Sequence, residues 1–563
     1  MWILGLAGSH NSAVALTRDG EVVAAIQSER LTRHKRQHFH VAKLGLVALR
    51  GIKYCLDYAD IGLDEVDYFA TCTPGRHIQA AFTEQALSVI DGQFDPAFVS
   101  VPHHLAHAEY ALHYANPLPE RCLILVCDGS GSFEDCRAQL DIKETIADDA
   151  QIFLAGEGKE SISAYAYEHG QARLIYRVAL EAVPGLPFLN SLGHFWQWAA
   201  GYCHGSEFDA GKVMGLAPYG DPEVYRHLRI IEFGADGRPC FDFGPLVAEL
   251  QQPNTDKRDV SGCQHYADLA AHIQRATNQF LIELVRYLQA RFPTDNLCYS
   301  GGVALNGVAN EIVARELGLN LLVNGSCEDN GTALGAAFAL HHHLTGERRA
   351  EPVTDFYGRT YSTDDIEAAL DQAGLSYQTM EHPDMLAFAA QALAAGKIVG
   401  WFQGRSEFGP RALGNRSILA DPRPATIKDQ LNQKVKFRES FRPFAPVVLE
   451  DRADELFALR GAPSPVMLRV VPVKAAGLPG ITHVDGSGRV QTVNPAQNAI
   501  LCQLLASFEQ VAGVPVLLNT SFNLAGQPIV EAPRHAIETF LGSGIDVLIM
   551  GDTVVEKTAP SAD

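Results

Sequence analysis

The sequence predicts an α/β fold, because short apolar strands repeatedly end in glycine-rich turns that lead into polar or helical segments. The pattern occurs at residues 5–13 ("GLAGSHNSA"), at residues 122–131 ("CLILVCDGSG") and at residues 296–310 ("NLCYSGGVALNGVAN"). In open α/β sheets, loops at the ends of such strands meet along one edge and form a crevice. We therefore expect the three loops to converge on one binding site.

The length of 563 residues and a change in pattern near residues 346–365 predict two domains. Hydrophobic periodicity lapses in that stretch and charge rises, before Ser362 or Thr363 can cap a new helix. We place the boundary after residue 355, which gives an N-terminal domain of residues 1–355 and a C-terminal domain of residues 356–563.

Individual elements follow from local patterns in chain order. Residues 3–7, 13–18 and 21–27 predict consecutive antiparallel strands, with a turn at Asp19-Gly20. A helix is expected from His103, another from about Leu305, and a third over residues 278–292. Beyond the boundary, strands and loops are expected within residues 397–410, 443–449 and 514–523.

Composition excludes several classes of protein. The formal net charge of -21 disfavours sequence-independent binding to nucleic acid, which needs a broad basic face. No apolar run approaches membrane-spanning length, and the N-terminus lacks the basic segment of a secretion signal. Eleven scattered cysteines without a C-x-x-C pair favour reduced thiols, so we expect a cytoplasmic protein that acts on small molecules.

Two histidines and two aspartates are candidate metal ligands. His103 and His107 are four residues apart and share one face of the expected helix, while Asp128 and Asp329 follow glycine-rich strand ends. Such a set suits iron, manganese or zinc. The alternative is a polar helix face with satisfied histidines, together with two aspartates that only form turns. The Glu of an H-E-x-x-H zinc protease is missing.

Glycine-rich loops favour nucleotide binding without a Walker motif. The segment "GSEFDAGKVMG" fails the Walker pattern, because its spacing differs and Val213 replaces the required Ser or Thr. The loops at Gly129 to Gly131 and at Gly301-Gly302 offer backbone N–H groups for phosphate oxygens. His10 follows the first strand, where an imidazole could accept a proton from an attacking hydroxyl.

Basic residues concentrate in the C-terminal domain. Residues 405–442 hold nine Lys or Arg against four acids, although the whole chain is acidic. Arg489, Asn519 and Ser521 follow near further strand ends. Guanidinium groups match phosphate and carboxylate oxygens, and the interleaved Gly and Pro residues favour a rigid anion pocket. The alternative is a surface patch for an acidic partner.

Five sequence blocks carry a family resemblance. They are "GKVMGLAPYG", "GRSEFGPRALGNRSILADPR", "KFRESFRPFAPVVL", "VQTV" and "LNTSFN". The chain resembles the NodU/CmcH family of O-carbamoyltransferases over nearly its whole length. This resemblance implies a duplicated N-terminal domain of the actin-like ATPase fold, similar to the enzyme that makes threonylcarbamoyl-adenosine in tRNA. It also implies a YrdC-like α/β domain at the C-terminus.

The resemblance implies a two-step reaction. The C-terminal domain would form carbamoyl-adenylate from carbamoyl phosphate and ATP, with Mg²⁺ accompanying ATP. The N-terminal domain would transfer the carbamoyl group to a hydroxyl of a small natural product, as in antibiotic biosynthesis. By motif position, the residues binding carbamoyl phosphate and ATP would be Arg411, Lys436, Arg438, Arg442, Arg489, Asn519 and Ser521.

The same resemblance implies roles in the N-terminal domain. The metal ligands would be His103, His107, Asp128 and Asp329, with iron as the expected ion. The adenylate would be bound by Gly129, Ser130, Gly301, Gly302 and Asn306. His10 would be the base, Lys35 would contact the intermediate and Asp209 would line the acceptor side. Arg76, in "CTPGRH", would bind the acceptor.

Two departures and three rival functions stay open at this point. Asn11 stands where many relatives have Asp, and the adjacent His104 leaves the ligand register uncertain. An actin-fold small-molecule kinase would explain the N-terminal glycine loops but not the arginine-rich C-terminal domain. A nucleotide-dependent scaffold or sensor would bind without forming a product. A tRNA-modifying enzyme is chemically close, but the acidic balance counts against it.

Overall fold

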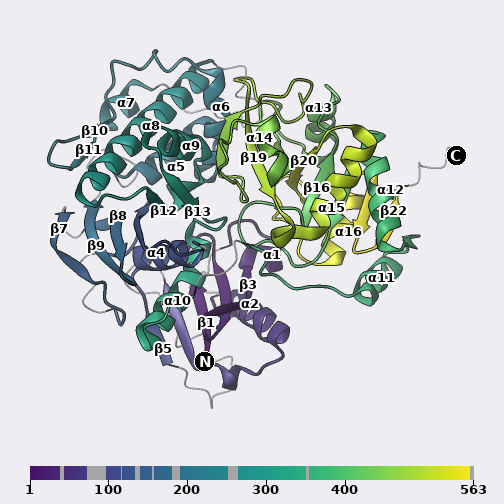
Figure 1. The fold of residues 1–563 in the computed structure, drawn as a ribbon, viewed down its shortest axis with the longest axis horizontal. Helices are drawn as coiled ribbons and strands as arrows, with labels where there is room; N and C mark the ends of the chain where they lie inside the picture. The colour runs from purple at the N-terminus through teal and green to yellow at the C-terminus, as the bar shows by residue number, and fades with distance from the viewer. Residues whose placement is uncertain are drawn as a thin grey trace. The chain divides into compact units, whose positions relative to one another are not determined.

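The computed structural model describes residues 1–37, 44–72, 97–115, 117–133, 140–154, 158–180, 190–250, 264–349 and 354–557. The chain divides into two compact units (Figure 1). The first comprises residues 1–32 and 36–353, and the second comprises residues 354–563 together with the short segment 33–35. The predicted α/β class is confirmed, whereas the roles assigned to residues 1–355 and 356–563 stay predictions.

The first unit contains a five-stranded sheet in the order β3-β2-β1-β4-β5. Its strands are β1 (Trp2–Ala7), β2 (Ala13–Arg18), β3 (Glu21–Gln27), β4 (Tyr68–Cys72) and β5 (Ala97–Ser100). The first three strands form an antiparallel meander, as predicted, and β4 and β5 join the other side of β1 in parallel. The carboxyl ends of β1, β4 and β5 therefore lie at one edge.

A second sheet in this unit repeats the same arrangement. Its order is β13-β12-β6-β8-β9-β7. The strands are β6 (Arg121–Cys127), β7 (Ile146–Leu154), β8 (Lys159–Glu168), β9 (Gln171–Leu180), β12 (Asn296–Ser300) and β13 (Asn320–Val323). Strands β6, β8 and β9 form the meander, β12 and β13 continue in parallel from β6, and β7 is added beside β9. The unit is therefore a topological duplication.

Helices pack tightly where the two sheets approach each other. Helix α10 (Thr332–Thr345) contacts β1 and also α4 (His103–His113). A Cβ atom on Gly5 would lie 1.8 Å from the Ala333 carbonyl oxygen, and one on Gly335 would lie 1.8 Å from that of Ala106. Glycine at these two positions allows the helix backbone to approach the strand and the neighbouring helix.

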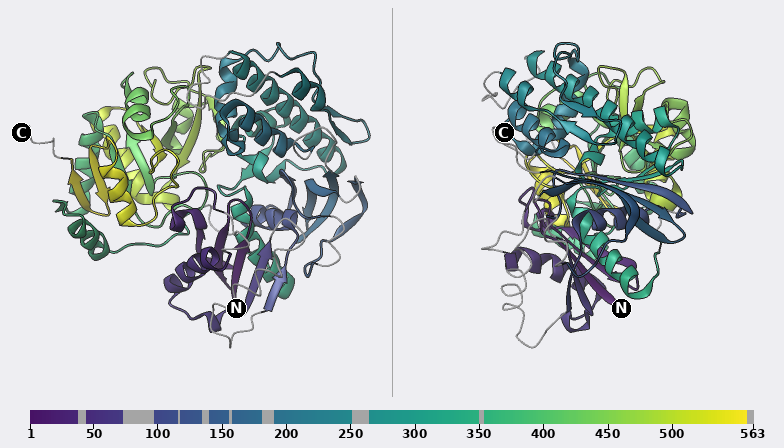
Figure 2. Two further views of the ribbon diagram at one scale, coloured as in Figure 1. Left: turned by 180° about the vertical axis from the view of Figure 1, so that it is seen from behind. Right: turned by 90° about the vertical axis from the view of Figure 1, so that its left-hand side faces the viewer.

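The first unit contains seven further helices among its described residues. They are α1 (Ser28–Thr32), α2 (Leu44–Ala59), α5 (Leu192–His204), α6 (Ala210–Leu216), α7 (Gly244–Glu249), α8 (Gln264–Arg291) and α9 (Gly307–Leu317). Helices α8 and α9 contact each other (Figure 1). Figure 2 shows the teal helical part of the unit, to which both belong, from two further sides. The small hairpin β10 (Ile231–Phe233) and β11 (Pro239–Phe241) contacts α8 through β10. Helix α9 begins two residues beyond the predicted start, because a short turn (Gly302–Leu305) precedes it.

The second unit is built on one mixed sheet in the order β14-β22-β21-β15-β16-β20-β17-β19-β18. Its strands are β14 (Gln378–Thr379), β15 (Val399–Phe402), β16 (Arg416–Ala420), β17 (Ala445–Leu449), β18 (Arg469–Pro472), β19 (Ser487–Val493), β20 (Val516–Ser521), β21 (Val547–Met550) and β22 (Thr553–Glu556). Its helices are α11 (Thr363–Gln372), α12 (His382–Ala394), α13 (Ile427–Leu431), α14 (Ala453–Leu456), α15 (Pro495–Ala512) and α16 (Pro533–Leu541). Ser362 caps α11, as predicted.

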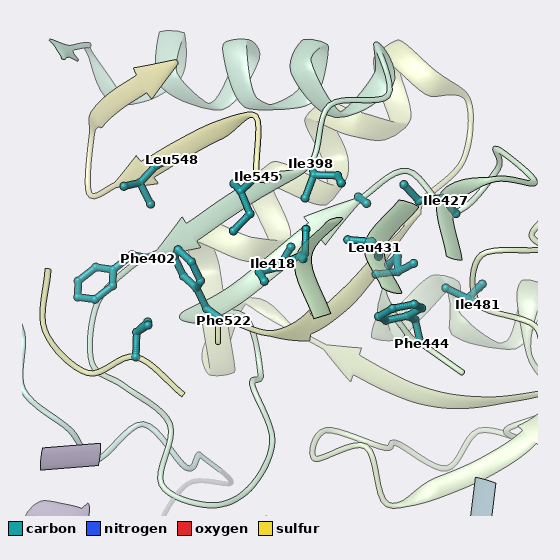
Figure 3. Close-up of a cluster of buried hydrophobic side chains, with 14 of the residues drawn as sticks. Ile398, Phe402, Ile418, Ile427, Leu431, Phe444, Ile481, Phe522, Ile545 and Leu548 are labelled. Atoms are coloured by element: carbon teal, nitrogen blue, oxygen red, sulfur yellow. The ribbon is translucent and has the colours of Figure 1, made fainter. Parts of the chain in front are cut away.

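Both faces of this sheet are buried. Along β16, Ile418 and Ala420 join one apolar cluster and Leu419 joins the other, as the two-residue period of a strand requires. Figure 3 shows the first cluster, in which the Phe522 ring lies between Phe402 and Ile418. The strands therefore form a middle layer, and their ends and loops are left to carry polar side chains. Within the described residues, no helix combines the length and apolar character needed to cross a bilayer.

Candidate active sites

Four buried side chains of the first unit converge as a candidate metal centre. His103 and His107 come from α4, Asp128 follows β6, and Asp329 begins the short turn before α10. One ligand atom from each lies within 4.8 Å of the others. The Nε2 atom of His103 is 3.5 Å from a carboxylate oxygen of Asp128 and 3.6 Å from one of Asp329. The predicted four residues are thus brought together.

Both imidazoles present the same nitrogen to the cluster. The Nδ1 atom of His107 lies 3.1 Å from the Ser300 hydroxyl, and the Nδ1 atom of His103 lies 3.4 Å from the Cys72 thiol. These contacts leave each Nε2 facing the carboxylates. Metal-binding histidines in proteins are oriented in this way by a partner on the other ring nitrogen. Ser300 and Cys72 gave no sequence signal, because such partners follow no fixed spacing.

His104 lies outside the cluster formed by His103, His107, Asp128 and Asp329. Its Nδ1 atom is 2.8 Å from the Ser163 hydroxyl, and its side chain is fully buried. Burial lowers the pKa of His104 to about 3, so the ring is neutral at physiological pH. Of the three histidines at the start of α4, His103 and His107 are the pair that faces Asp128 and Asp329.

The carboxylates of the cluster are held ionised. Burial alone would raise the pKa of Asp329, but hydrogen bonding and positive charge from His103, followed by His107, keep it well below its usual range. The Gly302 N–H donates to the Asp128 carboxylate at 2.8 Å. Two imidazoles, which bind metals in their neutral form, and two ionised carboxylates are all buried here. Together they form a donor set that fits a divalent transition metal.

A buried ion pair supports the start of α4. Glu160 accepts hydrogen bonds from the backbone N–H groups of His104 and Ser132, at 3.1 and 2.9 Å. The Arg177 guanidinium lies 3.3 Å from Glu160 and 2.6 Å from Glu144. Because all three charged groups are removed from water, their mutual pairing is needed to satisfy them. This network fixes the helix that carries both histidines.

His10 lies beside the cluster, at the turn after β1. Its Nδ1 atom is 3.6 Å from Asp329, and its ring stacks on Phe208 at 5.6 Å. Asp209 follows Phe208 directly, and its carboxylate pairs with Lys212 at 2.9 Å. The predicted base therefore lies next to the candidate metal centre, and the segment that holds its ring also carries Asp209.

The two glycine loops contact each other beneath the cluster. Gly301 has φ +94°, and a Cβ there would lie 2.3 Å from the Cys127 carbonyl oxygen. Within the described part of the chain, the N–H groups of Gly129 and Ser130 have no protein acceptor. The Gly302 N–H is already engaged by Asp128. The free donors are therefore at Gly129 and Ser130.

Three other predicted residues have different settings. The Asn306 side chain caps α9 by accepting from the Ala309 N–H at 3.1 Å, and it also pairs with Gln274. Lys35 belongs to the segment grouped with the second unit. Arg76 lies outside the described residues. Asn306 thus has a role in the fold beside its predicted role in adenylate binding.

A cluster of basic side chains forms the candidate site of the second unit. It comprises Arg411, Lys436, Arg438, Arg442 and Arg489. Lys436 ends a π-helical turn (Asn432–Lys436) after α13, and its ammonium group donates to the carbonyl and side chain of Asn523, at 3.2 and 2.9 Å. Arg438 donates to Asn432 at 2.9 Å and stacks over Phe444. The predicted basic residues are brought together.

This cluster carries excess positive charge. Burial, followed by the charges of Arg438 and Arg442, lowers the pKa of Lys436 well below its usual range. Burial and neighbouring arginines likewise lower the pKa of Arg489 and of Arg438. Glu439 lies 3.6 Å from Arg442, and its charge opposes the lowering of the Arg438 pKa without cancelling it. Cations confined in this way are stabilised by a bound anion.

Neutral amides and hydroxyls complete this site. Asn519 donates to Gln491 at 2.7 Å and to the Ala412 carbonyl at 3.2 Å, which leaves its buried Oδ1 without a partner among the described residues. The Ser521 hydroxyl donates to the Asn523 side chain at 2.6 Å. Sequence analysis missed Gln491 and Asn523, although both fall within the quoted blocks "VQTV" and "LNTSFN".

Three of the four arginines within residues 404–423 serve the fold. Arg416 is fully buried, donates to the carbonyls of Gln403 and Gly404, and stacks 3.6 Å over Phe402. Arg405 donates to backbone carbonyls, and Arg423 pairs with Asp421 at 2.6 Å. Arg411 is the member of this run whose charge acts on Arg489.

Comparison with known proteins identifies the family. A family model described as the carbamoyltransferase N-terminus matches residues 2–88 and 243–338, and one described as the carbamoyltransferase C-terminus matches residues 390–557. The nodulation protein NolNO of Sinorhizobium fredii is 34% identical over 588 residues, covering 98% of this chain and 80% of that protein. The chain belongs to the carbamoyltransferase family.

Other relatives include an antibiotic-modifying enzyme by name. The 3'-hydroxymethylcephem-O-carbamoyltransferase of Amycolatopsis lactamdurans is 36% identical over 264 residues, or 46% of this chain and 49% of that protein. Among solved structures, full-length HypF in a phosphate- and nucleotide-bound form has a TM-score of 0.38 at 12% identity and covers 62% of this chain and 56% of that one. A hexokinase of the ROK family from Thermus thermophilus has a TM-score of 0.32 at 14% identity, with 62% and 100% covered.

The protein is accordingly an enzyme of the carbamoyltransferase family. The matched stretches include all of one candidate site and only part of the other. The basic cluster of the second unit lies wholly within the matched C-terminal stretch. In the first unit, His10 and Asp329 lie in matched stretches, whereas His103, His107 and Asp128 fall between them. The candidate metal centre therefore rests on its geometry, because only Asp329 of its four residues lies in a matched stretch.

Proposed function

We propose that this carbamoyltransferase is an ATP-dependent O-carbamoyltransferase that works through carbamoyl-adenylate. The second unit, which we assign to the YrdC-like class, forms the adenylate. The first unit, which we assign to the actin-like ATPase class, transfers the carbamoyl group to a hydroxyl of a small natural product. The observation that carries the proposal is the gathering of basic side chains around Lys436, Arg438 and Arg489, because guanidinium and ammonium groups held together suit a polyanion.

The activating step consumes carbamoyl phosphate, ATP and one water. Water displaces phosphate from carbamoyl phosphate and leaves carbamate, which has one carboxylate oxygen free to react. That oxygen attacks the α-phosphorus of ATP, and the bond to pyrophosphate breaks. The basic side chains hold the phosphate groups and offset the charge that develops during phosphoryl transfer. Mg²⁺ accompanies ATP, and the unpartnered Oδ1 of Asn519 can accept from the carbamoyl amide.

The transfer step uses the buried cluster of the first unit. The acceptor oxygen attacks the carbamoyl carbon, the bond to the AMP oxygen breaks, and His10 takes the hydroxyl proton. Its position 3.6 Å from Asp329, beside the cluster, supports this role. A divalent ion, which we propose to be iron held by His103, His107, Asp128 and Asp329, would supply Lewis acidity to the carbamoyl and phosphoryl oxygens.

The test is an isotope-exchange assay that needs no acceptor. Purified protein is incubated with ATP and labelled pyrophosphate, with and without carbamoyl phosphate. The proposal predicts exchange that depends on carbamoyl phosphate and is lost in Arg489→Ala. Arg423→Ala, which removes an arginine paired with Asp421, is the matched control and should retain exchange. Normal exchange in Arg489→Ala would show that the basic cluster is not the activating site.

A further inference from the structure

The segment that connects β15 to β16 folds around a buried carboxylate, Glu407. One oxygen of this side chain accepts three backbone N–H groups, those of Leu413 and Asn415 at 2.8 Å each and that of Arg416 at 3.0 Å. The side chain is only 2% exposed, so water does not replace these contacts. Because hydrogen bonds to a carboxylate are among the stronger ones in proteins, they fix the course of residues 413–416.

Further contacts hold the same loop. The Ser417 hydroxyl accepts from the Gly414 N–H at 3.0 Å, and the Asn498 side chain donates to that of Asn415 at 2.9 Å. Gly414 has φ +111°, and a Cβ there would lie 2.4 Å from the Leu501 side chain. The backbone of the loop is therefore supported by side chains from several parts of the second unit.

The carbonyl groups of this loop join it to the candidate site of the second unit. The Gln491 side chain donates to the Leu413 carbonyl at 2.7 Å, and the Asn519 side chain donates to the Ala412 carbonyl at 3.2 Å. Gln491 and Arg489 are two residues apart on β19, so their side chains lie on the same face of that strand. The loop that Glu407 supports is thus built into the site through two amide side chains.

Arg411 belongs to the basic cluster and directly precedes Ala412, so the position of its guanidinium depends on this loop. The other oxygen of Glu407 is buried and has no hydrogen-bond partner among the described residues. A negative charge close to an anion site opposes anion binding. The charge of Glu407 therefore does not explain its presence, whereas the three N–H groups that it holds do.

We propose that Glu407 is a positioning residue of the activating site, which acts through residues 411–416 to place the Arg411 guanidinium against a bound polyanion. This assignment rests on the proposed function, in which the polyanion is carbamoyl phosphate or the triphosphate of ATP. The Glu407 side chain is buried behind the loop, so it acts through the loop and makes no contact with the ligand.

The test is calorimetric titration of the full chain with pyrophosphate, in two variants that change Glu407 in opposite ways. Glu407→Asp keeps the charge, but its shorter side chain cannot reach all three N–H groups. It should weaken binding about tenfold, the loss expected when one guanidinium contact is given up. Glu407→Gln removes the charge and keeps an acceptor oxygen at full reach, so it should bind pyrophosphate as tightly as the unaltered chain. A role through charge alone predicts unchanged binding in Glu407→Asp and tighter binding in Glu407→Gln.

A double-mutant comparison shows whether Glu407 acts through Arg411. Arg411→Ala should itself weaken pyrophosphate binding about tenfold, and adding Glu407→Asp to it should cause no further loss. Asp454→Ala is the matched control, because Asp454 holds another loop of the same unit by accepting from the N–H groups of Arg460 and Gly461 at 2.7 and 2.6 Å. This control should bind pyrophosphate as the unaltered chain does.

Thermal unfolding checks each variant. If Glu407→Asp does not fold, Ser417→Ala takes its place, because it removes the acceptor of the Gly414 N–H in the same loop. It should weaken binding when Arg411 is present and not in Arg411→Ala.

Four outcomes would overturn the inference. They are an unaltered chain that binds no pyrophosphate, unchanged binding in Glu407→Asp, an equal loss in Glu407→Gln, and losses that multiply when Glu407→Asp is combined with Arg411→Ala. Failure of the proposed function is a separate result. It appears as missing carbamoyl phosphate-dependent exchange in an unaltered chain that still binds pyrophosphate.

Discussion

The Nε2 atoms of His103 and His107 lie 3.2 Å apart. Their Nδ1 atoms are held by Cys72 and Ser300, so neither ring can turn away without losing a contact. Two like nitrogens at this distance, facing two ionised carboxylates, must share a proton or a metal ion. A bound cation removes the repulsion between lone pairs and satisfies all four groups at once.

Removing one of these histidines should separate the two half-reactions. We expect His107→Ala to lose bound metal while carbamoyl phosphate-dependent pyrophosphate exchange stays measurable, because exchange depends on the second unit. Metal content by mass spectrometry and exchange on the same preparation check this. His227→Ala, an exposed histidine paired with Glu249, is the control for metal content. Equal loss of metal and exchange would argue against a division of labour.

The Ser300 hydroxyl, which contacts the Nδ1 atom of His107, should affect metal affinity nearly as much as His107 itself. Ser300→Ala frees the His107 ring, so we expect metal affinity to fall about 10- to 100-fold, as is typical when a ligand's supporting partner is lost. Ser464→Ala removes a buried, hydrogen-bonded hydroxyl in the other unit and should leave affinity unchanged. Competition with a metal chelator measures both. Unchanged affinity in Ser300→Ala would mean that Ser300 does not orient a ligand.

The basic cluster should make stability depend on pH in a defined direction. The pKa of Lys436 is lowered in the folded chain, so between that value and its ordinary value of about 10.4 the unfolded chain binds more protons. The free energy of unfolding therefore rises with pH across that interval. Below it, the cost of burying the protonated Lys436 beside other cations is fully present. Compared with Lys436→Met, the wild type should gain thermal midpoint as pH rises.

Pyrophosphate gives the matching control for that measurement. A bound polyanion favours the protonated Lys436, so it should reduce the pH-dependent difference between wild type and Lys436→Met. Midpoints are followed by scanning calorimetry with and without pyrophosphate. If the thermal unfolding midpoint of the wild type falls relative to that of Lys436→Met as pH rises, the basic cluster does not carry excess positive charge.

The ion pair under α4 should be costly to break. Arg177→Met leaves Glu144 and Glu160 buried without their partner, and we expect a loss of about 3–5 kcal/mol in the free energy of unfolding of the first unit. Arg291→Met, which removes a partly exposed partner of Asp149, should cost less than about 1 kcal/mol. Denaturant unfolding compares them. Similar losses in both would mean that the network does not support the unit.

The sequence predicted those features that depend on residues close together in the chain and on glycine-rich turns. The first meander, the H-x-x-x-H helix and the cap at Ser362 are local features, and the structure has them. His103, His107, Asp128 and Asp329 were singled out by the H-x-x-x-H spacing, which is weak evidence alone, together with the aspartates at glycine-rich turns and the family resemblance; the structure brings the four side chains together. Their meeting at one point depends on β6 and β12 being neighbours, which the sequence alone did not specify.

The rest depends on contacts between distant residues. Arg416 and Arg411 look alike in sequence, yet one donates to the carbonyls of residues 403 and 404 while the other faces the basic cluster. Gln491 and Asn523 are uncharged, so no charge pattern marked them.

Product analysis of ATP turnover tests the central claim most directly. Purified protein is incubated with ATP, carbamoyl phosphate, Mg²⁺ and ferrous iron without acceptor, and the nucleotides and phosphates are identified by mass spectrometry. The account predicts AMP and pyrophosphate that form only when carbamoyl phosphate is present. ADP as the product, or turnover that does not depend on carbamoyl phosphate, would contradict it and favour a kinase.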